Sequence, residues 1–338
     1  MDQKIKYATI GTSWITEAFI TGTQLKKSMK LNAVFSRDAE KARKFGLKFG
    51  CDTIFNDIQE LAAYEGIDAV YIASPNSLHY SQSKLFLQNG KHVLCEKPIT
   101  VTPAEYEELT ELADKNKLIY LEALMIAHHP EREKIKQALE KIGNITTARL
   151  DFSQLSSRYQ SMLEGKTPNV FNPAMAGGCL MDMGVYCVFP AVDWFGIPDK
   201  IFTFAGKVSS GVDGYLNSLF IYSDKQVDIS LSKLGQSVLG CEILGDAGTI
   251  TIGFIVEMRD VFLVKRDGKK ETVIRNYSRS ELMSSEAESF CSYISHFNTS
   301  EKEYRHVQNQ TLKVLRVLDQ IKGLARINEN SCCNNNPL

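Results

Sequence analysis

Three side chains in this sequence have the types and neighbours needed to move a proton to or from an oxygen atom. Lys97 stands between Glu96 and Pro98 at the end of a short apolar run. Proline fixes its own φ and restricts the preceding residue to extended backbone, so a stiff segment aims the lysine. Asp182 and Tyr186 are four residues apart, which places both on one face of a helix. An ammonium near the phenol would bring the phenol's pKa down from about 10, and the pair could then serve an alcohol or carbonyl oxygen.

Each of these residues also has a structural interpretation. A lysine after a strand can be a plain surface residue, and a tyrosine in an apolar helix can be part of the core. Under the chemical interpretation, Tyr186 is the acid or base for the substrate oxygen, Lys97 polarises that oxygen and Asp182 fixes a hydroxyl. Gly177-Gly178, just before Asp182, would allow the backbone to approach a cofactor or substrate closely.

A second candidate site follows the first apolar run, at Gly11-Thr12-Ser13-Trp14-Ile15-Thr16. Only Gly11 remains of a G-x-G-x-x-G fingerprint, with Ser13 and Thr16 in the other two places. The context of strand, tight turn and helix N-terminus suits a dinucleotide phosphate, and the two hydroxyls could also bond it. An ordinary turn between a strand and a helix is the alternative.

The end of the next strand indicates which dinucleotide would bind. NAD sites usually have an acid there for the ribose hydroxyls, whereas NADP sites offer hydroxyls and arginine. This chain has Ser36-Arg37, and its acid, Asp38, comes next. Arg37 could pair with a 2′-phosphate, which favours NADP(H) over NAD(H). The alternative is an arginine at a helix start with Asp38 as its N-cap.

The first third of the chain alternates between strand and helix patterns, which predicts βαβ units and a parallel sheet. The expected strands are 5–10, 31–35, 68–73, 92–95 and 118–121, and the helices between them end near 28, 49, 90 and 115.

The second half has short apolar runs separated by polar turns, which predicts a mostly antiparallel sheet followed by two helices. The expected strands are 148–152, 201–208, 216–222, 227–234, 241–244, 249–252, 261–264 and 272–274, and the helices are 280–295 and 303–327. We therefore expect a Rossmann domain at 1–122, an α+β domain for substrate binding and oligomerisation at 123–327, and a polar tail at 328–338.

Three segments carry a family resemblance that covers nearly the whole chain. They are Ser74-Pro75-Asn76-Ser77-Leu78-His79, Gly90-Lys91-His92-Val93-Leu94-Cys95-Glu96-Lys97-Pro98, and Gly177-Gly178-Cys179-Leu180-Met181-Asp182-Met183-Gly184-Val185-Tyr186. Together they resemble the glucose–fructose oxidoreductase and inositol dehydrogenase (Gfo/Idh/MocA) family. Tyr186, where most members have histidine, resembles the branch of dimeric dihydrodiol dehydrogenase and xylose dehydrogenase.

The resemblance implies an NAD(P)-dependent dehydrogenase or reductase acting on a sugar, polyol, dihydrodiol or related substrate. Lys97, Asp182 and Tyr186 would be catalytic. The cofactor-binding residues would be Gly11, Thr12, Ser13, Trp14, Ile15, Ser36, Arg37, Ser74, Pro75, Asn76, His79, Glu96 and Lys97. Asn76 and His79 would line the nicotinamide, though His79 could equally be a helix-start residue. Glu96 would orient Lys97 or cap cofactor groups.

Two segments differ from the family pattern or extend it. The family often has arginine where this chain has Ala127, so His128 or His129 substitutes or the contact is absent. Those histidines lack the acidic or cysteine partners of a zinc site, and no metal is expected. The long polar loop 156–176 would shape the substrate pocket, with Tyr159 and Asn169 as substrate residues.

Composition narrows the function classes. A net charge of −1 gives no basic field for nucleic acid, and no apolar run is long enough to cross a bilayer. The eight cysteines are scattered, with no CxxC pair, which predicts free thiols and a cytoplasmic protein. The expected partners are a small-molecule substrate and a second copy of the chain in a homodimer.

A non-catalytic dinucleotide sensor on the same fold is the alternative function, because fold does not fix function. The reduced glycine loop and Ala127 favour the sensor, and retention of Lys97, Asp182 and Tyr186 together favours the enzyme.

Overall fold

The computed structural model describes residues 4–27 and 29–327. The described residues form two compact units, one made of 4–27, 29–130 and 278–309, and one made of 131–277 and 310–327. The expectation from the sequence was one division at residue 122, with every later helix in the second domain. In the structure, residues 278–309 belong instead to unit 1.

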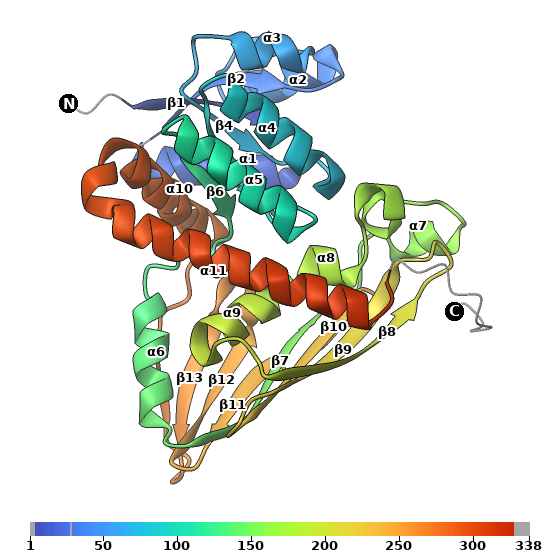
Figure 1. The fold of residues 1–338 in the computed structure, drawn as a ribbon, viewed down its shortest axis with the longest axis vertical. Coiled ribbons are helices and arrows are strands. Elements are labelled where there is room, and N and C mark those ends of the chain that lie inside the picture. The colour runs from blue at the N-terminus through green and yellow to red at the C-terminus, as the bar shows by residue number, and fades with distance from the viewer. Residues whose placement is uncertain (1–3, 28, 328–338) are drawn as a thin grey trace. The chain divides into compact units, whose positions relative to one another are not determined.

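Unit 1 contains a parallel sheet with the strand order β3-β2-β1-β4-β5-β6, six strands within the described residues (Figure 1). The predicted Rossmann arrangement is thereby confirmed. The strands are β1 Ile5–Ile10, β2 Met29–Phe35, β3 Ile54–Phe55, β4 Ala69–Ile72, β5 His92–Glu96 and β6 Tyr120–Ala123. The helices are α1 Trp14–Lys26, α2 Ala39–Lys48, α3 Ile58–Ala63, α4 His79–Gln88, α5 Pro103–Lys115 and α10 Arg279–Ser295, with the short 3-10 helix η1 Asn76–Leu78 before α4.

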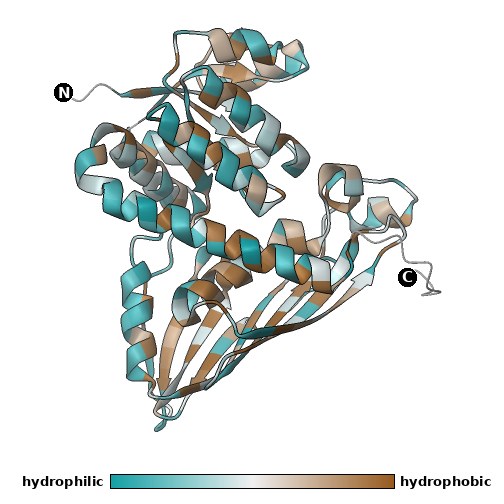
Figure 2. Cartoon of the chain, in the orientation of Figure 1, coloured by the Kyte–Doolittle hydropathy of each residue, from teal (hydrophilic) through white to brown (hydrophobic). Residues whose placement is uncertain are grey.

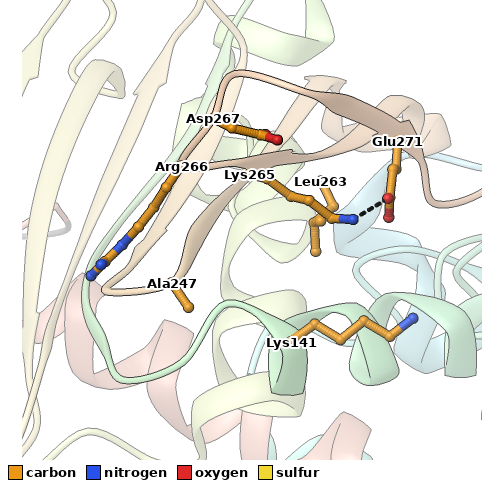
Figure 3. A pocket seen from close by; sticks show the side chains of 7 residues that line it. All are labelled: Lys141, Ala247, Leu263, Lys265, Arg266, Asp267 and Glu271. Atoms are coloured by element: carbon orange, nitrogen blue, oxygen red, sulfur yellow. Dashed lines mark hydrogen bonds and ion pairs between the residues drawn. The ribbon is translucent and has the colours of Figure 1, made fainter.

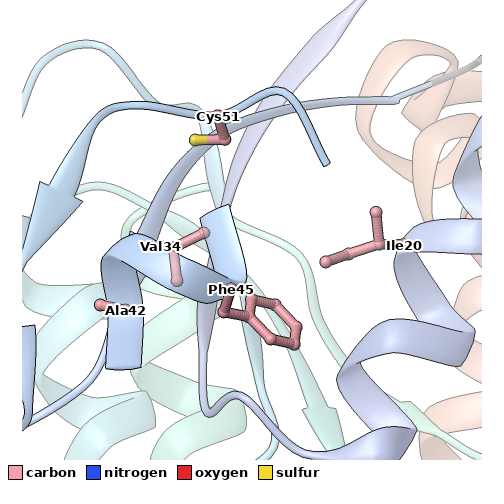
Figure 4. Packing of buried hydrophobic residues seen from close by; sticks show 5 residues of the cluster. All are labelled: Ile20, Val34, Ala42, Phe45 and Cys51. Carbon is pink, nitrogen blue, oxygen red and sulfur yellow. The ribbon is translucent and has the colours of Figure 1, made fainter. Parts of the chain in front are cut away.

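The core of unit 1 follows from covering both faces of the sheet with helices. Strand β4 is buried at every position, as expected of a strand inside a parallel sheet. Figure 4 shows one cluster in which Ile20 of α1, Val34 of β2 and Phe45 of α2 pack together with Ala42 and Cys51.

Helix α10 packs against α1, which is why residues 278–309 belong to unit 1. Lys26 of α1 forms an ion pair with Glu288 of α10. The helix begins with a capping box, in which Ser278 and Glu281 satisfy each other's backbone N–H groups. These contacts join residues far apart in the sequence, and the local pattern of 280–295 predicted the helix but not the unit it packs in.

Unit 2 contains a second sheet with the strand order β14-β13-β12-β11-β7-β10-β9-β8, eight strands within the described residues. Only β7 and β10 pair in parallel among those strands, so the predicted antiparallel sheet is confirmed. The strands are β7 Ile145–Ser153, β8 Lys200–Lys207, β9 Asp213–Ile221, β10 Gln226–Ser232, β11 Cys241–Gly245, β12 Gly248–Phe254, β13 Arg259–Lys265 and β14 Lys270–Thr272.

Helices pack against this sheet, α8 (Cys179–Met183) on β9 and β10, α9 (Val185–Phe195) on β7 and β10, and α6 (Arg132–Lys141) on β12. Along β10 every second residue is buried, and Figure 2 shows hydrophobic and paler segments alternating along the strands. The remaining elements are α7 Tyr159–Leu163, η2 Asn169–Phe171, η3 Pro173–Met175, η4 Ile255–Glu257 and α11 Phe297–Leu324.

No single helix in the described residues is long and apolar enough to cross a membrane. The helices 173–183 and 185–195 have the length and apolar composition of a membrane span only when they are taken together across their 46° bend. Most of their residues from Cys179 to Val192 are buried inside unit 2.

Free thiols were expected, and the six cysteines within the described residues are free, Cys291 being half-buried and the others buried. The expected polar tail and the cysteines at 332 and 333 lie outside the described residues.

Candidate functional site

The predicted cofactor segments meet at the carboxyl edge of the parallel sheet in unit 1. The strand register pairs Ile10 with both Phe35 and Ile72, and Ile72 with Cys95. The residues that follow these strands therefore lie side by side. After β1 the chain continues to β2 on one side, whereas after β4 it continues to β5 on the other side. Parallel sheets bind ligands at the carboxyl edge where the strand order reverses in this way.

The turn after β1 requires a glycine. Gly11 has φ +108°, and a Cβ there would lie 2.6 Å from the carbonyl oxygen of Ala73. Ser13 then occupies the N-cap position of α1 with extended backbone, and its exposed side chain makes no capping hydrogen bond. The first N–H groups of this 13-residue helix are thus not capped by Ser13, which suits an anion such as a phosphate.

The other positions of this turn have different surroundings. Thr16 is fully buried, so of the two hydroxyls expected to reach a phosphate only that of Ser13 is exposed. Thr12 and Ile15 are half-buried. Trp14 is 64% exposed, and the guanidinium of Arg279 lies 5.0 Å from its ring centroid. Sequence reasoning missed Arg279, which comes from the distant helix α10.

The residues after β2 offer an exposed cation to a ligand, while the carboxylate beside it is engaged in a helix cap. Asp38 caps α2, accepting hydrogen bonds from the amides of Glu40 (3.0 Å) and Lys41 (3.1 Å), so its role as an N-cap is confirmed. Arg37 is exposed and makes no hydrogen bond or ion pair within residues 4–27 and 29–327. Together with Ser36, these residues fit a ribose that carries a 2′-phosphate better than one with two free hydroxyls.

His79 connects the segments after β4 and β5. Its Nδ1 lies 2.8 Å from the carbonyl oxygen of Pro98, and its Nε2 lies 2.9 Å from that of Ser74. Burial lowers the pKa of the ring, and a neutral ring donates to one of these two acceptors. A fully buried imidazole thus fixes the Lys97–Pro98 segment against the Ser74 loop; contact of His79 and of its half-buried neighbours Pro75 and Asn76 with nicotinamide stays a prediction.

Lys97 is half-buried and is joined to Pro98 by a cis peptide bond. The neighbouring Glu96 is buried and accepts a hydrogen bond of 2.5 Å from the phenol of Tyr71. Burial raises the pKa of Glu96, and the Lys97 ammonium opposes that rise. Glu122, which sequence reasoning quoted without giving it a role, accepts a hydrogen bond of 3.0 Å from the amide of Ile99 and so holds the segment after Pro98.

Glu286 of α10 was also missed. Its side chain is 1% exposed, and neither carboxylate oxygen has a hydrogen-bond partner within the described residues. Burial, with the charges of Glu96 and Glu122, raises the pKa of Glu286 well above its ordinary value. A helix with an unremarkable amphipathic pattern gives no sign in the sequence that one of its glutamates will be enclosed.

In unit 2, Asp182 and Tyr186 lie on two successive helices. The helix expected to carry both is divided at Gly184 into α8 and α9, and the axis bends by 46° between residues 173–183 and 185–195. Gly184 itself has helical backbone, so the chain continues its turn through the bend.

Asp182 forms an ion pair and a hydrogen bond with Lys233, which directly follows β10. The Lys233 side chain is 5% exposed and that of Asp182 is 31% exposed. Sequence reasoning missed Lys233, although a signal exists: it continues the inward set Val227, Ile229 and Leu231 of the alternating strand.

Tyr186 is 9% exposed and meets the ring of Phe152 edge-on, with centroids 5.5 Å apart. Phe254 in turn contacts the ring of Phe152 edge-on, with centroids 5.9 Å apart. The edge-on contact with Phe152 therefore restricts the rotamers of the Tyr186 ring.

The two glycines before α8 serve packing within unit 2. A Cβ on Gly177 would lie 2.7 Å from the carbonyl oxygen of Asn169, and one on Gly178 (φ +116°) would lie 2.0 Å from Oδ1 of Asp213. The buried Asp213 accepts hydrogen bonds from the amide of Leu180 (2.6 Å) and the thiol of Cys179 (2.9 Å). Protein groups thus already occupy the close approach that the sequence suggested for a cofactor or substrate.

The segment 156–176 is more ordered than the expected polar loop. It contains α7, η2 and η3, and its residues Met162 and Phe171 form a small core with Val208 and Val212. Tyr159, expected to face the substrate, packs against this core. Asn169 is exposed, and its backbone carbonyl accepts a hydrogen bond from the amide of Asn172.

The histidines after β6 lie in a turn. His128 and His129 are 8% and 5% exposed, and the ring of His128 lies near that of Tyr293 (6.4 Å between centroids). Ala127 is buried. The described part of the chain contains no group of three or more His, Cys, Asp and Glu side chains that could hold a metal ion.

A hollow of about 630 Å³ lies elsewhere in unit 2, beside the β13–β14 hairpin (Figure 3). Lys265 and Glu271, two of its lining residues, form an ion pair, and none of the predicted site residues lines it. Its lining is Lys141, Ala247, Leu263, Lys265, Arg266, Asp267 and Glu271.

Comparison with known proteins agrees with the fold and the motifs. Residues 5–124 match the oxidoreductase family with an NAD-binding Rossmann fold, and residues 133–251 match the GFO/IDH/MocA C-terminal domain. The scyllo-inositol 2-dehydrogenase (NADP(+)) of Bacillus subtilis is 40% identical over 269 residues, covering 80% of this chain and 82% of that protein.

More distant relatives extend the comparison. The trans-1,2-dihydrobenzene-1,2-diol dehydrogenase of Xenopus tropicalis is 29% identical over 225 residues, covering 65% of this chain and 66% of that protein. The fold resembles that of KijD10, a 3-ketoreductase from Actinomadura kijaniata in complex with NADP and TDP-benzene, with a TM-score of 0.83 at 20% identity over 95% of this chain and 98% of that one. With its two domains, its carboxyl-edge turn and its Glu96-Lys97-Pro98 segment, the chain belongs to the Gfo/Idh/MocA family of oxidoreductases.

Proposed function

We propose that this chain is an NADP(H)-dependent dehydrogenase or reductase acting on a ring that carries neighbouring hydroxyl groups, such as a cyclitol or a sugar. The observation that carries the cofactor choice is the end of β2, where Asp38 is committed to capping α2 while Arg37 is exposed and unpaired within the described residues. The substrate class rests on the relatives, since an inositol dehydrogenase and a dihydrodiol dehydrogenase act on rings of this kind.

In this proposal the bound nicotinamide supplies or accepts the hydride. Tyr186 carries the proton to or from the substrate oxygen, its ring held by Phe152. The ammonium of Lys97, on a segment fixed by His79 and Glu122, stabilises negative charge on that oxygen. Asp182 accepts a hydrogen bond from a neighbouring hydroxyl and so selects the orientation of the ring.

The test combines turnover with cofactor binding in single variants. Lys97→Ala and Tyr186→Phe are expected to lower kcat by about 100-fold or more, as for lost general acid–base groups, while NADPH still binds. Lys115→Ala and Tyr222→Phe are the matched controls, one exposed lysine in unit 1 and one structural tyrosine in unit 2, whose hydroxyl donates to Gly196. Turnover is measured on a panel of inositols, aldoses and their ketones. If neither site variant loses turnover, the assigned roles are wrong; NADPH binding without any turnover by the wild type would favour the sensor.

We also propose that the protein is a cytoplasmic homodimer that pairs through the sheet of unit 2. Phe202 and Phe204, two residues apart on β8 and so on one face of the sheet, are 61% and 64% exposed. Light scattering of the wild type and of Phe202→Ser/Phe204→Ser tests this, and a wild-type monomer would contradict it.

A further inference from the structure

A buried lysine in unit 2 has no role in the function described so far. Strand β10 alternates between buried and half-buried residues, and Lys233 continues the buried set one step beyond its end. A position in that set normally holds an apolar side chain, as Val227, Ile229 and Leu231 do. Burying an ammonium there costs several kcal/mol unless a partner compensates it, so packing alone gives no reason for a lysine.

The partner is Asp182. Its carboxylate forms the ion pair and the hydrogen bond with the Lys233 ammonium, and it is the more exposed of the two. A half-buried aspartate with part of its surface open to water depends less on a lysine for its own stability than the buried lysine depends on the aspartate. The pair is therefore better explained by what the lysine does to the aspartate than by the reverse.

A second carboxylate shares the field of this lysine. Lys233 acts electrostatically on Asp213 and on the thiol of Cys179, opposing the rise that burial causes in the pKa of each. Asp213 is fixed beneath the start of α8 by its bonds from Leu180 and Cys179. The ammonium thus sits within the field of two acids, one buried and fixed and one, Asp182, with part of its surface open.

We propose that Lys233 is a positioning residue that holds the Asp182 carboxylate in one rotamer, so that it accepts a hydrogen bond from a substrate hydroxyl. This inference rests on the proposed function, in which Asp182 contacts the substrate. An ionised carboxylate is an acceptor only, so it discriminates in favour of a substrate hydroxyl and against a bare carbonyl at that position.

The test uses Lys233→Met, Asp182→Asn and the double variant, with Lys200→Met, an exposed lysine at the start of β8, as the matched control. Losing a hydrogen bond to a charged group lowers kcat/KM by about 10- to 100-fold, and this loss is expected for Lys233→Met at neutral pH, without a change in NADPH affinity. The loss should be confined to substrates that carry the hydroxyl which Asp182 would bind and should be absent for analogues that lack it, which a merely structural role would not produce.

The double variant gives the second decision. If Lys233 acts through Asp182, removing it from Asp182→Asn costs no further kcat/KM, and this comparison stands even where Lys233→Met alone does not fold. An additional tenfold loss in the double variant, or a Lys233→Met enzyme with the activity and substrate preference of Lys200→Met, overturns the proposal. A wild type that turns over no inositol, sugar or corresponding ketone refutes the proposed function and the role of Lys233 with it. Wild-type turnover combined with an inert Lys233→Met change refutes only the lysine.

Discussion

Replacing Arg37 by alanine should change cofactor preference without harming the fold. The side chain is exposed, and within the described residues it makes no hydrogen bond or ion pair, so its removal breaks no internal contact. The acid beside it cannot take over, because Asp38 is held by the amides of Glu40 and Lys41. Only a ligand that carries a phosphate near this point should register the change.

The size of the effect follows from the chemistry of the pair. A hydrogen bond to a charged group contributes about 1.5–3 kcal/mol, and a guanidinium can bind a phosphate through two such bonds. Since Arg37 is exposed, water and salt reduce this energy, and the lower half of the range is the reasonable expectation. With about 1.4 kcal/mol for each factor of ten, the Kd for NADPH should rise about 10- to 30-fold. The Kd for NADH should stay within about twofold, because NADH lacks the group that Arg37 would bind.

The assay is a fluorescence or calorimetric titration of both cofactors at low and at high salt. Arg43→Ala is the matched control, since Arg43 is an exposed arginine on α2 and its loss changes the net charge by the same amount. The difference between wild type and Arg37→Ala should shrink as salt is raised. Equal weakening of NADPH and NADH, or the same loss in Arg43→Ala, would refute the assignment of Arg37 to a 2′-phosphate.

Three further predictions concern stability. Burial lowers the pKa of His92 from 6.5 to about 4, and its Nδ1 accepts a hydrogen bond from the amide of Ile119. The stability that the neutral ring contributes is therefore complete above pH 6.5 and is lost as the pH falls towards 4, by up to about 3 kcal/mol. In urea unfolding, His92→Asn should lose less stability over this range than the wild type, and parallel pH curves would contradict this. Burial raises the pKa of Glu286 well above its ordinary 4.5, so the stability that the protonated acid contributes is present below pH 4.5 and is lost as the pH rises. The advantage in Tm of Glu286→Gln over wild type should therefore grow as the pH rises above 4.5, and a constant difference would count against an enclosed acid. Gly178→Ala should lower the free energy of unfolding by about 2–4 kcal/mol, because Gly178 has positive φ and the added Cβ would clash with Asp213. Gly165→Ala is the control, since Gly165 also has positive φ but has open space around it, and it should cost about 1 kcal/mol. Equal losses in the two variants would show that the clash with Asp213 is relieved.

Regular patterns in the sequence predicted most of the elements. Alternating apolar runs and amphipathic stretches located β1, β4, β5 and α5 to within one or two residues, because local periodicity and punctuation specify them. The short elements were missed: β3 has two residues, and α7 has five. Such pieces bury too little surface to impose a period, so tertiary contacts decide them.

For the candidate site, the residue types were readable and their surroundings were not. The sequence singled out Lys97, Asp182 and Tyr186 by their neighbours. It did not reveal Lys233, whose ion pair joins positions 51 residues apart, nor Glu286, which is enclosed because α10 returns to pack on α1.

The order of residues alone determined that strands alternate with helices in the first third, that a glycine follows β1, and that an arginine rather than an acid directly follows Ser36. These are local properties, because backbone preference and side-chain period act over a few neighbouring positions. Only the tertiary structure decided that Glu286 is enclosed, that Asp38 caps α2, and that the ammonium of Lys233 pairs with Asp182. Burial and ion pairing depend on segments that are distant along the chain, and no local pattern records them.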